Sequence, residues 1–305
     1  ERAPFYVVGE VTGDHRFVLE DKNQPRNPMN LQLADMFGNP PKLILRDKTC
    51  EKKYPDVTLD PEKLDTYLQQ VLQLEAVACK DWLTNKVDRS VTGRVATQQT
   101  AGKVQLPVND LGVMALDYSG CAGLATSIGH APAPALIDPR AGSRLALAEA
   151  LTNLVWAPLE GGLDAVSLSA NWMWPAKNEG ENARLYNAVE ALSEFCIELG
   201  INIPTGKDSL SMTQKYPDGK LVLAPGTVII SAVGEVNNVG KTVRAALRHQ
   251  QGSALFWVRF AQGPLDLGGS SLAQALNQLG SKPADVNDAD YFRKAFNALQ
   301  ALIEK

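Results

Sequence analysis

Two polar residues on a predicted helix have the types and spacing of magnesium ligands. Residues 141–156 have helical periodicity, and Glu149 and Asn153, four residues apart, lie one above the other on a face away from the apolar stripe. That stripe is formed by Leu147, Leu151, Leu154 and Val155. The small residues Ala146 and Ala150 lie close to the polar pair and would let a ligand approach. Carboxylate and amide oxygens suit Mg²⁺. The spacing alone favours a solvated helix face with an ordinary Glu and Asn, because such pairs are common.

A third oxygen ligand is available at Asp110, which directly precedes the apolar run 111–116. A carboxylate at the start of a strand could complete an oxygen cage with Glu149 and Asn153. Taken alone, Asp110 also fits a turn residue, because Asn-Asp pairs favour turns.

Lysine side chains that could bind phosphate occur at two further places. The string Thr205-Gly-Lys-Asp-Ser is not a P-loop, because Gly200 and Gly206 are separated by five residues and Asp208 replaces the hydroxyl that would hold magnesium. Lys207 and Asp208 stay a candidate polar pair beside Gly206, with a plain strand connection as the alternative. Lys80 follows a predicted helix and by itself fits a surface charge.

Composition limits the possible functions. The 305 residues are 45% hydrophobic and 21% charged, with a net charge of −4, as in globular proteins that do not bind nucleic acid. The longest nearly uncharged apolar stretch, 221–234, is interrupted by Pro225 and Gly226 and is too short to span a membrane. The four cysteines form no C-x-x-C pair, which predicts reduced thiols and a cytoplasmic location.

The elements that must position these residues alternate between helix and strand. Hydrophobic periodicity predicts helices at 61–79, 141–156 and 182–199, the last ended by Gly200. Strands are predicted at 104–108, 111–117, 164–170, 222–235 and 254–258. The pattern predicts a mixed α/β protein, and both ends of the chain have the character of cuts within a longer polypeptide.

A series of short strings, in this order, resembles one family. They are Asp88-Arg-Ser-Val-Thr-Gly, Leu106-Pro-Val-Asn-Asp, Glu149-Ala-Leu-Thr-Asn, Leu168-Ser-Ala-Asn-Trp-Met and Ile203-Pro-Thr-Gly-Lys-Asp-Ser-Leu-Ser-Met. Together they resemble the synthetase region of the large formylglycinamide ribonucleotide amidotransferases, and the resemblance covers nearly the whole chain. The loop Gln98-Gln-Thr-Ala-Gly-Lys matches that family only loosely.

The resemblance implies a division into four segments. Residues 1–21 would end a preceding synthetase C-terminal-like domain, and 22–77 would be a connector with a helix. Residues 78–248 would form an α/β domain like the N-terminal domain of aminoimidazole ribonucleotide synthetase, and 249–305 would begin a further C-terminal-like domain. The partners implied are the rest of the same polypeptide, namely a first synthetase half and a glutaminase domain. A homodimer through the sheets is a further hypothesis.

The resemblance also implies roles for the candidate residues. The family's reaction joins ammonia from glutamine to formylglycinamide ribonucleotide with ATP and Mg²⁺, and this segment would hold an auxiliary Mg-ADP or Mg-ATP site without catalysing turnover alone. Asp110, Glu149 and Asn153 would bind magnesium, whereas Asn109 would contact the nucleotide and Lys80 its phosphates. Lys207 and Asp208 join the nucleotide-binding set without a defined role. The competing hypotheses are a non-catalytic nucleotide-binding scaffold and another ATP-dependent synthetase of the same superfamily.

Overall fold

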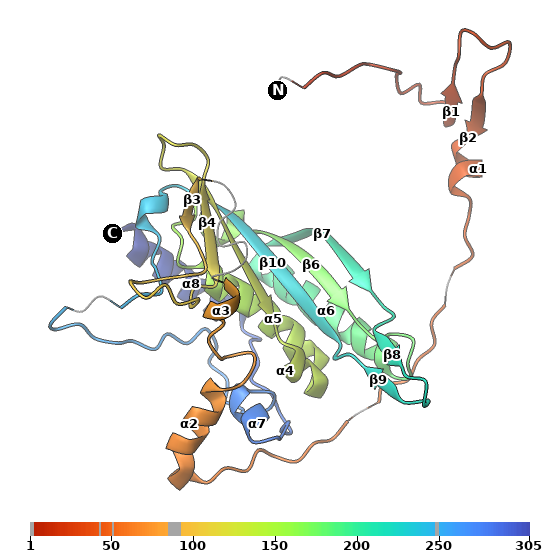
Figure 1. Ribbon diagram of the computed structural model, residues 1–305. Coiled ribbons are helices and arrows are strands. Elements are labelled where there is room, and N and C mark those ends of the chain that lie inside the picture. Colours follow the sequence, from red (N-terminus) through yellow and green to blue (C-terminus); the bar gives the residue numbers. More distant parts are fainter. Residues whose placement is uncertain (1–2, 43, 51, 85–92, 248–249) are drawn as a thin grey trace. The chain divides into compact units, whose positions relative to one another are not determined.

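The computed structural model describes residues 3–42, 44–50, 52–84, 93–247 and 250–305. The chain forms two compact units, Glu1–Arg46 and Asp47–Lys305 (Figure 1). In the first unit, strand β1 (Arg16–Leu19) pairs antiparallel with β2 (Met29–Gln32), and the short helix α1 (Leu33–Phe37) follows directly. Its apolar side chains are largely exposed, so this unit has no hydrophobic core of its own among the described residues.

The second unit contains a six-stranded mixed sheet in the order β3-β4-β5-β10-β6-β7. Its strands are β3 (Val95–Thr97), β4 (Leu111–Ala115), β5 (Gly123–His130), β6 (Ser167–Met173), β7 (Asn202–Ser209) and β10 (Thr227–Val236). Neighbouring strands are antiparallel except β6 and β7, which are parallel. The parallel pair is joined through a long helix, as the geometry of such crossovers requires.

Helices cover one face of this sheet (Figure 1). They are α4 (Pro132–Ile137), α5 (Pro139–Leu154), α6 (Glu181–Leu199) and α8 (Ala289–Glu304). Helix α5 packs on β5 and β10, α6 packs on α5, and α8 packs on α6. The shorter elements are α2 (Leu64–Leu72), α3 (Asp81–Thr84), α7 (Ser271–Ala275), the hairpin β8 (Thr213–Lys215) and β9 (Leu221–Leu223), and the 3₁₀ turns Pro61–Lys63, Gly162–Ala165 and Val239–Lys241.

The ends of α5 and α6 follow from their local sequence. The Asp138 carboxylate accepts hydrogen bonds from the backbone N–H groups of Arg140 and Ala141, and Pro139 occupies the first turn, where its missing N–H costs nothing. Helix α6 ends at Gly200, whose positive φ of 65° is strain-free only for glycine. The predicted helices at 141–156 and 182–199 are therefore confirmed, the first beginning two residues earlier.

The N-terminus of α6 is capped by a residue distant in sequence. The Asp47 carboxylate accepts hydrogen bonds from the backbone N–H groups of Gly180 (2.9 Å), Asn182 (3.0 Å) and Ala183 (3.2 Å). These are donors that a helix cannot satisfy internally, and a negative charge is favourable at this end of the helix dipole. The contact ties Asp47, the first residue of the second unit, to helix α6 of the same unit.

Helix α8 joins the last part of the chain to the same hydrophobic core. Phe292 and Phe296 are fully buried, and the Phe292 ring meets Phe195 of α6 edge-on. One turn further, the Gln300 amide accepts a hydrogen bond from Leu159 N–H and donates to the carbonyls of residues 155 and 157. Residues 47–305 consequently form one compact unit, while the four-segment division proposed from the resemblance stays a prediction.

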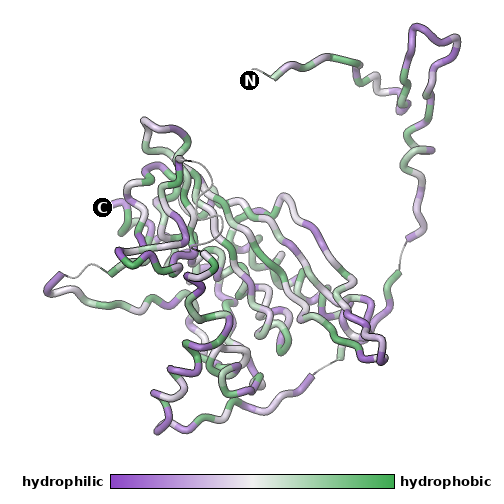
Figure 2. The backbone as a smooth tube through the Cα atoms, in the orientation of Figure 1, coloured by the Kyte–Doolittle hydropathy of each residue, from purple (hydrophilic) through white to green (hydrophobic). Residues whose placement is uncertain are grey.

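Among the described residues, the other face of the sheet leaves apolar side chains exposed, and we call it the open face. Burial alternates along β5, with Ala125 and Ser127 directed toward the helices, and Thr126 and Ile128 directed away from them. Ile128 is 58% exposed, and Met114 and Val233 on neighbouring strands are also exposed. Figure 2 shows hydrophobic stretches of chain within the central strands.

Several predicted strands differ from the structure. Residues 104–108 form no strand beyond an isolated bridge between Leu106 and Ala101, and 254–258 form no strand, leaving Leu255, Phe256 and Trp257 exposed. The predicted strand at 222–235 is two strands separated by Pro225-Gly226, and the helix at 61–79 ends at Leu72. Apolar content favours a strand, but a strand forms only where a neighbouring strand is placed to pair with it.

Within the described residues, no helix has the length and apolarity needed to cross a membrane.

Candidate functional site

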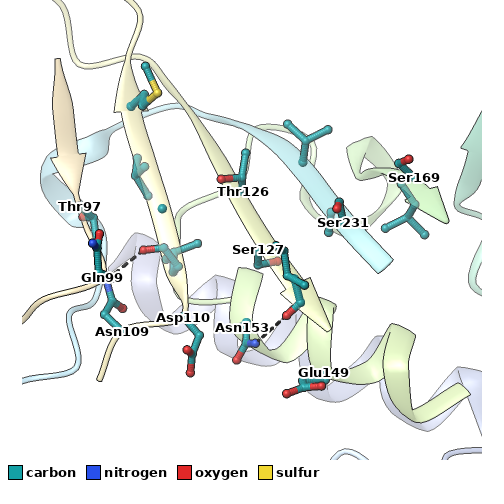
Figure 3. Close-up of a pocket in the computed structure, with 18 of the residues that line it drawn as sticks. Thr97, Gln99, Asn109, Asp110, Thr126, Ser127, Glu149, Asn153, Ser169 and Ser231 are labelled. Carbon is teal, nitrogen blue, oxygen red and sulfur yellow. Dashed lines mark hydrogen bonds between the residues drawn. The ribbon is translucent and has the colours of Figure 1, made fainter. Parts of the chain in front are cut away.

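A broad cavity of about 1040 Å³ lies along the open sheet face and the end of α5 (Figure 3). Its floor is made by strands β4, β5, β10 and β6, and one rim is made by the segment before β4 and by helix α5. Polar residues lining the cavity include Thr97, Gln99, Asn109, Asp110, Thr126, Ser127, His130, Glu149, Asn153, Ser169, Thr205 and Ser231.

The tertiary structure brings the three predicted magnesium ligands to this one cavity. Figure 3 shows Asp110, Asn153 and Glu149 along the same rim, Asp110 from the start of β4 and the other two from α5. They meet because β4 pairs with β5 in register Leu111↔Ser127, which places the beginning of β4 beside the end of β5, where α5 packs. Side chains from distant parts of the sequence thus share one rim.

The end of β5 orients both α5 side chains. Glu149 Oε2 accepts a hydrogen bond from the His130 backbone N–H at 2.7 Å. Asn153 Nδ2 donates to the Ile128 carbonyl at 3.0 Å. Each side chain uses one polar atom in this way, so Glu149 Oε1 and Asn153 Oδ1 are the atoms left for a ligand. The His130 imidazole Nδ1 lies 3.9 Å from Glu149 Oε2.

Asn109 fixes the segment that carries Asp110. Its side-chain amide donates to the carbonyls of Gln98 (2.7 Å) and Leu111 (2.9 Å), which ties the loop before β4 to the residue that follows β3. Asn109 lines the cavity, so it can contact a ligand only through its remaining carbonyl oxygen. Its predicted role as a nucleotide contact stays a prediction.

Three other predicted residues do not line this cavity. The Lys80 ammonium donates to the Ala78 carbonyl at 2.9 Å, and the Lys207 ammonium donates to the Ser209 hydroxyl at 2.6 Å. Asp208, like Lys207, lies on the edge strand β7, of which only Pro204 and Thr205 reach the cavity. The string Asp88-Arg-Ser-Val-Thr-Gly lies outside the described residues except for Gly93.

The charge of the cavity lining favours a cation. Among the described lining residues there are two carboxylates, Asp110 and Glu149, and no Lys or Arg. The donor set of two carboxylates and the Asn153 amide suits a hard cation that keeps several waters. Within the described part of the chain, no three His, Cys, Asp or Glu side chains gather into a metal-binding group, so a cation here would depend on the Asn153 amide oxygen.

The sequence pattern failed to indicate β5, although this strand supplies the backbone that orients Glu149 and Asn153. The strand reads Gly-Leu-Ala-Thr-Ser-Ile-Gly-His, in which small and polar residues dilute the apolar alternation. The burial alternation along the strand is nonetheless regular, and Leu124, Thr126 and Ile128 share one face as a period of two requires. That weak alternation is the signal that could have identified the strand.

The fold and cavity define a mixed α/β domain with an acidic, amide-containing rim beside an open sheet face. Comparison with known proteins identifies the class: residues 79–235 match the family described as the FGAR-AT PurM_N-like domain. The chain belongs to this family, and the resemblance inferred from the sequence motifs is confirmed.

Curated relatives agree with that assignment. The chain is 40% identical, over 99% of its length, to probable phosphoribosylformylglycinamidine synthase, chloroplastic/mitochondrial, from Arabidopsis thaliana. It is also 40% identical, over its whole length, to phosphoribosylformylglycinamidine synthase from Homo sapiens. It spans only 22% and 24% of those two proteins. Among solved structures, T. maritima PurL complexed with ADP aligns with a TM-score of 0.48 at 18% identity, covering 76% of this chain and 33% of that one.

Proposed function

We propose that this chain forms part of a glutamine-dependent, ATP-hydrolysing carbon–nitrogen ligase of purine biosynthesis. The reaction converts formylglycinamide ribonucleotide, glutamine and ATP into formylglycinamidine ribonucleotide, glutamate, ADP and phosphate. The support is the 40% identity, along essentially the whole chain, to two phosphoribosylformylglycinamidine synthases. The remainder of such a polypeptide, including a glutaminase domain, is the proposed partner. A cytoplasmic location stays part of the proposal, although the Arabidopsis relative is named for organelles.

Within that ligase, we assign to this chain an auxiliary Mg-nucleotide site. The observation that carries the assignment is the convergence of Asp110, Glu149 and Asn153 on one cavity whose described lining has no Lys or Arg. Phosphates are anions, and two carboxylates would repel them unless a cation lies between. Mg²⁺ bound by these oxygens would supply that charge neutralisation, leaving Asn109 to contact the nucleotide.

Three residues that we expect to contact the nucleotide lie outside the cavity lining. They are Lys80, Lys207 and Asp208, and both lysine ammonium groups donate hydrogen bonds to residues two positions away in the chain. A phosphate contact from Lys80 would require its ammonium to leave the Ala78 carbonyl. We propose that these three residues contact the nucleotide only after its binding moves them toward the cavity.

The open sheet face supports a further proposal about assembly. Exposed apolar residues Met114, Ile128 and Val233 lie on adjacent strands of that face. We propose that a second sheet covers these three apolar residues of the cavity floor and leaves the rim of Asp110, Glu149 and Asn153 accessible to nucleotide. The second sheet would be the other synthetase half in the longer polypeptide, or a second copy when this chain is alone.

The test of the nucleotide site is a single isosteric substitution. Glu149→Gln keeps an oxygen that can accept the His130 N–H but removes one negative charge from the rim. We expect Mg-ADP binding to the full-length polypeptide, measured by calorimetry, to weaken at least about tenfold, or about 1.4 kcal/mol. The control is Glu160→Gln, an exposed carboxylate that does not line the cavity.

Two outcomes would contradict the proposal. Unchanged Mg-ADP affinity in Glu149→Gln would remove the metal role from this rim. Robust amidine formation by the 305-residue chain alone, with glutamine or ammonia, would contradict the auxiliary assignment. The alternative is a non-catalytic nucleotide-binding or scaffold module. If the chain served only as a scaffold, neither the wild type nor either variant would bind Mg-ADP at this rim.

A further inference from the structure

The contact between the end of β5 and helix α5 is unusually close. An added Cβ at Gly129 would lie 2.2 Å from the Ala146 carbonyl oxygen and 2.3 Å from the Ala150 amide nitrogen. Both are backbone atoms of α5, so no side-chain rotation could relieve the overlap. Any residue other than glycine at 129 would therefore push the helix backbone away from the strand.

A buried hydrogen bond also joins β5 to α5, two residues before Gly129 on the strand. The Ser127 hydroxyl donates to the Ala150 carbonyl at 2.6 Å, and Ser127 is only 5% exposed. The two helix residues facing the strand, Ala146 and Ala150, are completely buried and have the smallest side chains that a helix tolerates well. The absence of a side chain at Gly129 allows β5 and α5 to pack this closely, and the Ser127 hydrogen bond holds them at that separation.

This close approach decides whether the two α5 ligand candidates can reach the strand backbone. Glu149 accepts the His130 N–H at 2.7 Å, and Asn153 donates to the Ile128 carbonyl at 3.0 Å. These backbone groups flank Gly129 on either side. A helix displaced by about 1 Å would stretch both bonds beyond useful length, because hydrogen bonds weaken steeply past about 3.2 Å.

We propose that Gly129 and Ser127 are positioning residues of the cation site. They hold α5 close enough for the β5 backbone to orient Glu149 and Asn153, so that Oε1 of one and Oδ1 of the other are directed to the same ion. This inference rests on the proposed function, since it deepens the cation site assigned above. Groups that orient metal ligands are commonly worth a factor of about 10 to 100 in metal affinity.

A purely structural role for Gly129 would affect stability alone. The matched control is therefore another strand glycine, Gly234 of β10, where an added Cβ would lie 2.9 Å from the Leu159 Cδ2 atom. That neighbour is the end of a flexible side chain, and Gly234 is not part of the cavity lining. Gly234→Ala tests the cost of filling space in this sheet without displacing α5.

The experiment measures binding of Mn²⁺ alone to the 305-residue chain by the loss of its free-ion electron paramagnetic resonance signal. Gly129→Ala, Ser127→Ala and Gly234→Ala are compared with the wild type and with Glu149→Gln, at a temperature where circular dichroism shows each to be folded. We expect Mn²⁺ affinity to fall about tenfold or more in Gly129→Ala. We expect it to fall about fivefold in Ser127→Ala and to stay unchanged in Gly234→Ala.

The outcomes separate this inference from the proposed function. If Glu149→Gln binds Mn²⁺ as the wild type does, the cation site itself is wrong. If Glu149→Gln loses binding while Gly129→Ala and Ser127→Ala keep wild-type affinity, the positioning role is overturned and the site survives. Should Gly129→Ala not fold, Ser127→Ala decides, because it only removes one hydroxyl.

Discussion

Truncating Phe292 tests whether helix α8 belongs to the core of the α/β unit. The Phe292 ring is fully buried, with its centroid 6.1 Å from that of Phe195 on α6 and 5.1 Å from that of Phe260. Phe292→Ala removes the burial of the ring, both aromatic contacts and the packing of neighbouring atoms. Substitutions of this kind cost about 3 to 5 kcal/mol.

That cost converts to a measurable thermal shift. For a unit of this size, each kcal/mol moves the unfolding midpoint by about 2–4 °C, so we expect a decrease of about 6 to 20 °C. The assay is thermal unfolding of the 305-residue chain followed by far-ultraviolet circular dichroism, with urea unfolding to confirm the change in free energy. Asn297→Ala, at an exposed position of the same helix, is the control and should change stability by less than about 0.5 kcal/mol.

The result that would refute this reasoning is a shift of under about 2 °C in Phe292→Ala, equal to that of the control. Such a result would mean that α8 does not share the core with α6. It would also favour a separate domain beginning near residue 249, as the sequence resemblance implied. A separate, lower-temperature transition in the wild type that is lost in the variant would lead to the same conclusion.

Three further predictions concern thiols, pH and assembly. Burial raises the pKa of the Cys196 thiol to about 12. At about pH 8, iodoacetamide should therefore label the exposed Cys79 and Cys121, while Cys196 reacts only after unfolding. Rapid labelling of Cys196 in the folded chain would contradict its burial. The hydrogen bond from the Gly180 N–H, with those of neighbouring amides, lowers the pKa of Asp47 below its ordinary value of 3.8. The Asp47 carboxylate therefore contributes fully to stability above pH 3.8, and this contribution is lost as pH falls through the lower pKa of the folded state. Urea unfolding should therefore show Asp47→Ala less stable than wild type at about pH 6, with the difference shrinking below pH 3.8; a difference independent of pH would exclude the charged cap. Light scattering should detect dimers of the 33.0 kDa chain at high concentration, lost in Ile128→Glu, whereas a monomer throughout would contradict pairing through the open sheet face.

The sequence alone determined the elements that depend on nearby residues. Helices α5 and α6 are specified by apolar periodicity, by the Asp138 cap and by Gly200, all of which act within one or two turns. The same local geometry places Glu149 and Asn153 one above the other. The identity and order of the family's motifs along the chain were sufficient to identify the family, because they depend on residue types and not on how the chain folds.

Only the tertiary structure decided which residues meet at the cavity. Strand pairing joins segments far apart in the chain, so the register of β4 on β5, and with it the position of Asp110, cannot be derived from local spacing. For the same reason the apolar segment 254–258 forms no strand, while the weakly apolar β5 does: a strand needs a placed neighbour more than it needs a strong local preference. The close approach at Gly129, which brings the β5 backbone to Glu149 and Asn153, exists only once the helix and the strand are packed together.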